Sequence, residues 1–424
     1  MNKPVLLSVL LVASLSLISC GGGSVVPKPP SGLTERVFAS QSVSGPASQA
    51  GLVIINGQYD ILPRAGEISA GGAPGLMAIS PSRSTVLAFD SSTNSVNVAN
   101  TIKETNTGSI SLPGPTTSMV ALDNGFAYVP VPSAPIVGAS PGAVEVLNLT
   151  SGGTTATIPL PAAQTVVASP DGSEILVFSN DSNNVTVISP LLVNTGVPVT
   201  TTVSGFDQPV YAVFSSDGTT AYVLNCGPQC GSSSASASVE ILNMATLTTG
   251  TSVAVDAATI GLISGTNLYV AGTSPTNNKC NPQTTSAAVC GRLDTIDLGS
   301  MTVTGSAMIT DGYHDRIDIS ANAQLYIGSH TCTNIGNVND ISGEVRGCLS
   351  IFNTTNGNVI IPPDNGDVTG LQSFTTRFVL YVAEGGNLRV YDTDLNSLLL
   401  NDYITTGTIV IRGQVIDVKA VDFF

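Results

Sequence analysis

The chain has 424 residues, of which 10% are charged and 42% are hydrophobic, and its formal net charge is −15 at neutral pH. This charge and an isoelectric point near 4.3 exclude nucleic acid as an expected partner, because binding to phosphates depends on clustered Lys and Arg side chains. They equally exclude a polybasic contact with anionic lipid.

The first residues predict export and lipid attachment. A nearly uncharged stretch, 5–18, follows Lys3 as in an export signal, and it is shorter than the roughly 20 residues of a membrane span. It ends in Leu17-Ile18-Ser19-Cys20, which resembles the bacterial lipobox. We therefore expect Cys20 to be lipidated and to become the mature N-terminus. The alternative is an ordinary signal peptide, although the small-residue cleavage site that it requires is less evident.

Three segments follow from this interpretation: a lipoprotein signal peptide (1–19), a lipidated tether (20–33) and a folded part (34–424). The tether is rich in Gly and Pro, a composition typical of linkers and not of a core. Gly21, and not Asp, follows the lipidated cysteine, which favours delivery to an outer membrane if the cell has one. The expected location is the bacterial cell envelope, with the membrane contact made through the N-terminal lipid.

A repeated unit of short strands begins after the tether. Its clearest copies are 219–225 with 239–243, and 380–383 with 388–392. Turns such as Ser169-Pro170-Asp171-Gly172 and 215–218 connect the strands, and Asp-Gly favours tight hairpins. Strands with period-2 alternation that recur at roughly 43–56 residues predict the four-stranded blades of a β-propeller.

These motifs resemble the Tyr-Val-Thr-Asn (YVTN) repeat propellers of secreted bacterial and archaeal proteins. That family couples a Ser-Pro-Asp-Gly turn to a Tyr-Val-x-Asn strand and then to a Val-x-Val-Ile-Asp strand. The resemblance covers nearly all of the mature chain and implies an all-β, single-propeller fold. Its motifs are structural and imply little about chemistry.

The number of inner strands predicts eight blades. We place the starts of these strands at Pro74, Thr117, Ala163, Pro209, Ala258, His314, Thr369 and Ile416. The first unit, 37–68, has no inner strand before it, and the last strand, 415–421, has no unit of its own. The last strand is therefore expected to complete the first blade, which would remove the exposed sheet edges. Seven blades is the alternative, if the first or the third unit is misread.

Six further cysteines lie in three neighbouring loops between the second and third strands of their units. An even number in an exported chain favours disulfides. The position of each consecutive couple in the repeat predicts the pairs 226–230, 280–290 and 332–348, formed by Cys226, Cys230, Cys280, Cys290, Cys332 and Cys348. A zinc site is the competing interpretation, but the chain has no C-x-x-C and only two histidines. No metal or other cofactor is expected.

Candidate catalytic residues gather near one inner-strand entry. His314, Asp315 and Arg316 lie where their side chains are expected to line the mouth of the central channel, and His330 lies on the same face before Cys332. A histidine near carboxylates suits a general base. The alternative is a polar rim without catalytic function, in which Asp315 and Arg316 form a surface ion pair of small energetic value. Residues 392–396 have calcium-like spacing but lack the expected Gly and the terminal Glu, so they are interpreted as a turn.

Two classes of function remain open. The first is a non-enzymatic binding or scaffold protein, a monomer that presents its disulfide-closed loops to a protein or to an envelope polymer, since binding residues favour loops on a rigid scaffold. The second is a propeller hydrolase, lactonase or lyase that works at the channel mouth. A purely structural coat component is a minor third possibility. The fold does not decide among them.

Overall fold

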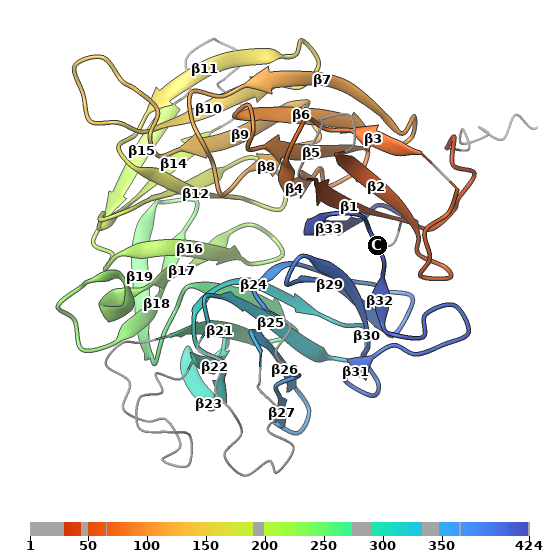
Figure 1. Cartoon of the computed structure of the whole chain (residues 1–424). Helices are drawn as coiled ribbons and strands as arrows, with labels where there is room; N and C mark the ends of the chain where they lie inside the picture. Colours follow the sequence, from red (N-terminus) through yellow and green to blue (C-terminus); the bar gives the residue numbers. More distant parts are fainter. Residues whose placement is uncertain are drawn as a thin grey trace, which may run out of the picture.

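The computed structural model describes residues 29–43, 50–64, 66–189, 199–273, 291–332, 347–363 and 366–422. They form eight antiparallel blades arranged in a ring (Figure 1). We number the blades in chain order, so that blade 1 contains β1–β3 and blade 8 contains β28–β32. The prediction of an eight-bladed propeller is confirmed.

Each blade has four strands, which we call first to fourth from the channel outward. The first strands are β33 (Gln414–Ala420), β4 (Pro74–Ile79), β8 (Val120–Ala121), β12 (Ala163–Ala168), β16 (Pro209–Phe214), β20 (Ile260–Ser264), β24 (Tyr313–Ile319) and β28 (Val368–Ser373). The second strands are β1 (Arg36–Ser42), β5 (Thr85–Asp90), β9 (Phe126–Val131), β13 (Ile175–Ser179), β17 (Thr220–Asn225), β21 (Asn267–Thr273), β25 (Gln324–His330) and β29 (Val379–Glu384).

The outer half of each blade contains the third and fourth strands. The third strands are β2 (Gly51–Asn56), β6 (Ser95–Asn100), β10 (Ala143–Asn148), β14 (Asn184–Ser189), β18 (Ala237–Asn243), β22 (Gly291–Asp297), β26 (Leu349–Asn353) and β30 (Asn387–Asp392). The fourth strands are β3 (Glu67–Ser69), β7 (Thr105–Ser111), β11 (Gly153–Pro159), β15 (Val199–Ser204), β19 (Thr248–Val255), β23 (Thr302–Ile309), β27 (Val359–Ile360) and, in blade 8, β31 (Ser397–Leu398) with β32 (Thr408–Ile409).

The last strand closes the ring, as the sequence predicts. β33 pairs with β1 in antiparallel register, Val37 opposite Ala420 and Ala39 opposite Val418. Blade 1 is therefore built from both ends of the folded chain. Every inner strand among the described residues belongs to one of the eight blades.

The core lies between the blades. Eight clusters of buried apolar side chains fill the eight interfaces between neighbouring blades. The second and third strands are buried on both faces, as in β5, whereas outer strands such as β15, with the sequence Val-Thr-Thr-Thr-Val-Ser, are largely exposed. Hydroxyl-rich outer strands explain how a chain with so few charges keeps a polar surface.

The ring has two faces that differ in their loops. The face at which the inner strands begin, which also holds the loops between second and third strands, is called here the entry face. The opposite face holds the tight turns between first and second and between third and fourth strands, and is called the turn face. At Ser169–Gly172 the main-chain N–H of Gly172 donates to the carbonyl of Ser169, and Gly172 has φ +68°, which favours glycine.

Helical structure is nearly absent from these ranges. The described residues contain one short 3-10 turn, η3 (Gly227–Cys230). None of them belongs to a helix that is long and apolar enough to cross a bilayer.

Candidate functional site at the channel and the entry face

A cavity of about 970 Å³ lies on the axis of the ring, lined by the inner strands of blades 2–7. Its wall is mainly apolar and hydroxyl-bearing. Among the lining residues the charged side chains are Arg83, Asp315 and Arg316. Two of these three charged side chains therefore lie in blade 7, and the third, Arg83, lies in blade 2.

Bulges place the side chains that face this cavity. The pairing of first to second strand skips Gln164 in blade 4, Val210 in blade 5 and Asp315 in blade 7, and all three line the cavity. A bulge adds one residue to a strand and changes the direction of its side chain. The bulge in β24 therefore interrupts the simple alternation of the strand and turns the side chain of Asp315 toward the cavity.

Asp315, Arg316 and His330, which the sequence places on one face, form one polar cluster at the entry face. The Asp315 carboxylate lies 2.9 Å from Nε2 of His330 and 3.0 Å from the Arg316 guanidinium, and all three side chains are partly exposed. Nε of Arg316 also donates to the main-chain oxygen of Thr369, at 2.7 Å, which attaches the cluster to blade 8. The cluster offers an oriented imidazole beside a carboxylate.

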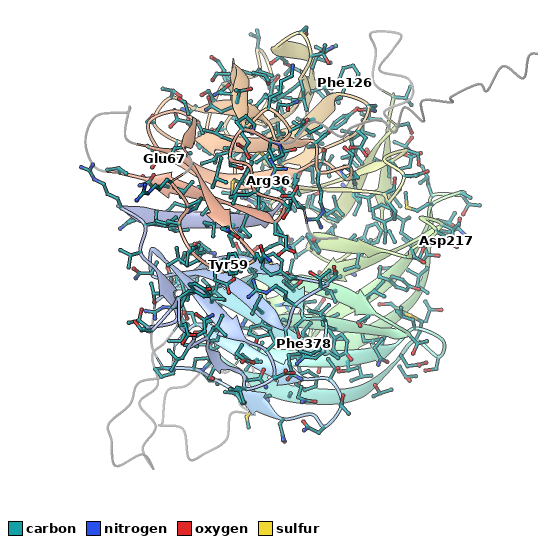
Figure 2. The ribbon with its side chains drawn as sticks, turned by 90° about the vertical axis from the view of Figure 1, so that its right-hand side faces the viewer. Arg36, Tyr59, Glu67, Phe126, Asp217 and Phe378 are labelled. Carbon is teal, nitrogen blue, oxygen red and sulfur yellow. A yellow bond between two sulfur atoms is a disulfide. The ribbon has the colours of Figure 1, made fainter. Side chains whose placement is uncertain are left out.

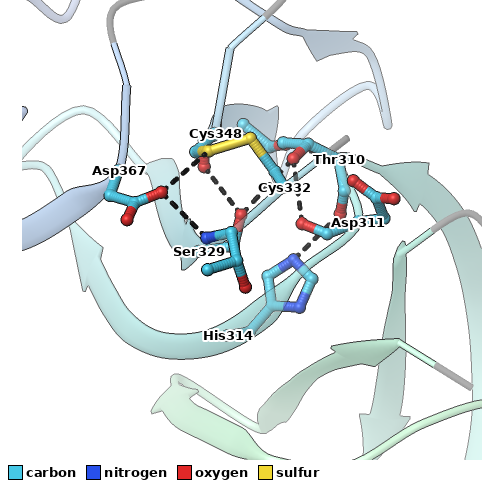
Figure 3. Close-up of a disulfide and its surroundings, with 9 residues drawn as sticks. Thr310, Asp311, His314, Ser329, Cys332, Cys348 and Asp367 are labelled. Carbon is cyan, nitrogen blue, oxygen red and sulfur yellow. Dashed lines mark hydrogen bonds between the residues drawn. A yellow bond between two sulfur atoms is a disulfide. The ribbon is translucent and has the colours of Figure 1, made fainter. Parts of the chain in front are cut away.

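His314 lies elsewhere, contrary to the expectation that it lines the channel mouth. Its side chain is 1% exposed, and its Nε2 donates to the carbonyl oxygen of Thr310 at 2.9 Å. A carbonyl only accepts, so Nε2 carries the proton. The main-chain oxygen of His314 accepts the Thr259 hydroxyl at 2.8 Å, which connects blades 6 and 7. Figure 3 shows His314 beside Thr310 and close to the Cys332–Cys348 disulfide.

Burial keeps His314 neutral and predicts a pH-dependent stability. Desolvation lowers its pKa from 6.5 to about 4, so below pH 6.5 the unfolded chain binds a proton that the folded chain does not. The folded state should lose about 3 kcal/mol as the pH falls from 6.5 to 4. Urea unfolding of the wild type and of His314→Gln across this range measures the effect, since the other titrating groups are common to both. Parallel stability curves for the two proteins would contradict the assignment.

Two of the three expected disulfides lie within the described residues. Cys226–Cys230 closes η3 in blade 5, and Cys332–Cys348 closes the loop between β25 and β26 in blade 7. The third pair, Cys280 with Cys290, lies outside the described residues. Both observed disulfides are on the entry face, because they belong to loops between second and third strands.

Hydrogen bonds attach these disulfide loops to neighbouring blades. Oε1 of Gln229, beside Cys230, accepts the main-chain N–H of Thr273 in blade 6 at 2.8 Å. The main-chain N–H of Thr331, beside Cys332, donates to Asp367 before blade 8 at 2.8 Å. Gly312 has φ +97°, and a Cβ there would lie 2.4 Å from the His330 oxygen, so a glycine lets the chain entering β24 pass under the blade 7 loop. These contacts attach the described ends of both disulfide loops to the neighbouring blades.

The calcium-like segment is a turn, as interpreted from the sequence. The carboxylate of Asp392 accepts the main-chain N–H groups of Asp394 and Leu395 at 2.8 and 3.0 Å. Within the described ranges, no three His, Cys, Asp or Glu side chains converge as metal ligands would. The absence of a metal cofactor stays a prediction.

Comparison with known proteins supports the propeller architecture but does not assign the chain to a family. The sequence matches no protein-family model and no curated protein. A structure of dihydro-heme d1 dehydrogenase NirN in complex with DHE is 13% identical, with a TM-score of 0.58 over 94% of this chain and 80% of that one. The fold is a β-propeller.

Two further propellers give the same result. A putative 6-phosphogluconolactonase from Bacteroides fragilis is 12% identical, with a TM-score of 0.52 over 92% of this chain and 98% of that one. The β-propeller domain of Cps50 (Swd1) from Myceliophteria thermophila is 10% identical, with a TM-score of 0.50 over 73% and 92%. At these identities the similarity shows the fold alone, since one fold hosts many functions.

Proposed function

We propose that this protein is an exported, lipid-anchored propeller of the YVTN-repeat type that acts as a non-enzymatic binding protein of the cell envelope. The lipid on Cys20 attaches it to the membrane, and the entry face binds a protein or an envelope polymer. The observation that carries the proposal is that the described N-terminal residues leave the ring on the turn face, opposite the disulfide loops. An anchor on one face leaves the other free for a partner.

The attachment of the N-terminal segment to the turn face is specific. The main-chain N–H and the hydroxyl of Ser31 both donate to the carboxylate of Glu104, at 2.6 Å, in the turn between β6 and β7. Arg36 bridges Glu104 at 3.0 Å and Asp422 at 2.7 Å, and the Arg36 and Glu104 side chains are nearly fully buried. The segment that precedes residue 31 therefore starts from a fixed point on the turn face.

The geometry favours binding over catalysis. His314, one of two histidines in the chain, is buried, neutral and bonded to a carbonyl oxygen. The cavity supplies shape and hydroxyl groups, and its described lining residues include no nucleophile and base at hydrogen-bond distance from each other. Recognition needs a fixed surface, whereas nucleophilic catalysis needs such a pair.

Site-specific crosslinking in the producing cells tests the binding face. A photoreactive phenylalanine analogue replaces Tyr313, which is 47% exposed at the entry face, or Asp217, which is exposed in a turn of blade 5 on the turn face. We expect adducts of discrete mass from position 313 only, and a reduced yield when Cys332→Ser and Cys348→Ser remove the disulfide. The same adducts from both positions, or none from position 313, would contradict an entry-face partner.

One observation favours a second candidate, a hydrolase, lactonase or lyase at the channel mouth. The Asp315 carboxylate orients the imidazole of His330 at 2.9 Å, an arrangement that suits proton transfer. If this candidate holds, purified protein hydrolyses or eliminates a lactone, ester or uronic substrate, and His330→Gln abolishes the reaction while His314→Gln preserves it. A wild-type protein that is inactive on such a panel removes the candidate.

A further inference from the structure

Exposed aromatic side chains gather where blade 8 meets blade 1. Four aromatic side chains are exposed in the described part of the chain, and three of them, Tyr59 at 40%, Phe378 at 51% and Tyr403 at 59%, lie at this junction. The rings of Tyr59 and Tyr403 are 5.3 Å apart. With the exposed leucines of the β2–β3 turn and of the segment between β31 and β32 they form a surface that we call the seam patch: Tyr59, Leu62, Phe378, Leu400 and Tyr403.

A buried ion pair holds the two halves of the seam patch together. Asp60 is 1% exposed. Its carboxylate accepts hydrogen bonds from Nη1 and Nη2 of Arg377, at 2.8 and 2.6 Å, and from the hydroxyl of Tyr381. These contacts fix the residues next to them, Tyr59 from blade 1 and Phe378 from blade 8. Figure 2 looks at the ring from the side of this junction, where Tyr59 and Phe378 are labelled.

Core packing fixes the backbone next to the third aromatic side chain, that of Tyr403. The residue after it in the segment between β31 and β32, Ile404, is 4% exposed and packs into the core between blades 8 and 1. Its neighbour, Tyr403, projects outward against Tyr59. Large apolar groups that a fixed backbone keeps in water indicate an interaction surface.

The seam patch belongs to the face from which the anchor leaves. Tyr59 lies in the turn between β2 and β3, and Phe378 lies in the turn between β28 and β29, both on the turn face with Ser31 and Glu104. The eleven residues from Cys20 to Pro30 span at most roughly 40 Å when fully extended. A lipid on Cys20 therefore keeps the attachment point of the tether, which is on the turn face, within that distance of the bilayer.

Beside the seam patch the exposed carboxylate of Asp402 adjoins Tyr403, whereas three carboxylates lie together on the far side of the turn face. On the far side of the ring, the turns of blades 3–5 carry Asp123, Asp171 and Asp217, which avoid the low-dielectric membrane. The seam patch instead offers phenol and benzyl rings, and tyrosine favours the boundary between headgroups and acyl chains, where one end is apolar and the other is wet.

We propose that the seam patch inserts into the interfacial layer of the membrane that holds the Cys20 lipid. The ring is then tilted, with the blade 8–blade 1 side of its turn face on the bilayer and its entry face directed away from it. This inference rests on the proposed lipid anchor and adds a second, orienting contact. Because the chain is acidic, the contact is apolar and does not depend on anionic lipid.

Single tryptophans test this contact, because the chain contains none. Phe378→Trp and Tyr403→Trp report from the seam patch, and Tyr313→Trp is the matched control, an exposed aromatic position on the entry face. The lipidated mature protein is reconstituted into phosphatidylcholine vesicles with brominated acyl chains. We expect the seam-patch tryptophans to shift to the blue and to lose about half or more of their emission, since interfacial side chains insert roughly 5–10 Å, while position 313 stays unquenched.

The outcomes separate the anchor from the seam patch. Acylated protein that floats with the vesicles, but whose tryptophans at 378 and 403 are quenched no more than that at 313, overturns the seam-patch contact and leaves the anchor in place. Protein that mass spectrometry shows without acyl groups on Cys20, and that does not float, overturns the anchor and with it this inference.

Discussion

A chain that ends at Arg412, without β33, should lose cooperative folding. β33 buries Val415 and Val418 between blades 8 and 1. It also joins two neighbouring blades, because Asp417 accepts the N–H of Met77 at 2.9 Å and the N–H of Ala420 donates to Gln372 at 3.0 Å. Each large aliphatic side chain contributes about 1.5–3 kcal/mol on burial, so the strand as a whole is comparable to a typical stability of roughly 5–15 kcal/mol.

Circular dichroism during heating measures this loss. A synthetic peptide of residues 413–422 should restore a cooperative transition when added to the shortened chain, and the same peptide with Asp417→Ala should restore less. A shortened chain that melts at the wild-type temperature would mean that the ring does not depend on its closing strand.

The second large effect is expected at Asp60. Asp60→Ala leaves the Arg377 guanidinium and the Tyr381 hydroxyl without their shared acceptor at the junction of blades 8 and 1. Breaking a buried ion pair from one side costs about 3–5 kcal/mol, and the partial exposure of Arg377 favours the lower end. Urea unfolding followed by fluorescence or circular dichroism gives the change in free energy.

The matched control is Asp402→Ala, which removes the same charge from an exposed position in the neighbouring segment of blade 8. It should change the stability by no more than about 0.5 kcal/mol. Equal effects of the two substitutions would show that the charge, and not the buried contacts, accounts for the loss.

The blades could be predicted because their signals are local. Strand alternation and the Ser-Pro-Asp-Gly turn at 169–172 occur within a few residues of each other, and the structure forms that turn with the expected hydrogen bond. Ring closure was predicted by counting, since one unit lacked an inner strand and one strand lacked a unit. The disulfides at 226–230 and 332–348 followed from their place between the second and third strands.

The position of His314 could not be predicted from alternation, because a bulge follows it. A one-residue change of register exchanges the two faces of a strand. Here Asp315 is skipped and turns to the cavity, while His314 turns into the blade. The equivalent positions in other blades hold Pro74, Ala163 and Pro209, all buried. Their apolar character was the available signal that this position belongs to the core.

The contacts at the junction of blades 8 and 1 had no sequence signal. Asp60 and Arg377 are 317 residues apart, and they meet only because the ring closes. The same holds for Arg36 and Asp422, which are 386 residues apart. Neither charge pair repeats in the other units, so the repeat gives no pattern from which to align them.

The closure of blade 1 by β33 has a consequence for the time at which the ring forms. Ser40 and Asp417, which are bonded across that closure, are separated by 377 residues. At synthesis rates of 5–20 residues per second, the chain between them takes roughly 20–75 s to make. Until β33 is available to the folding chain, β1 presents an unpaired edge, which other chains can join. The protein is therefore most prone to aggregation before its last residues join the fold.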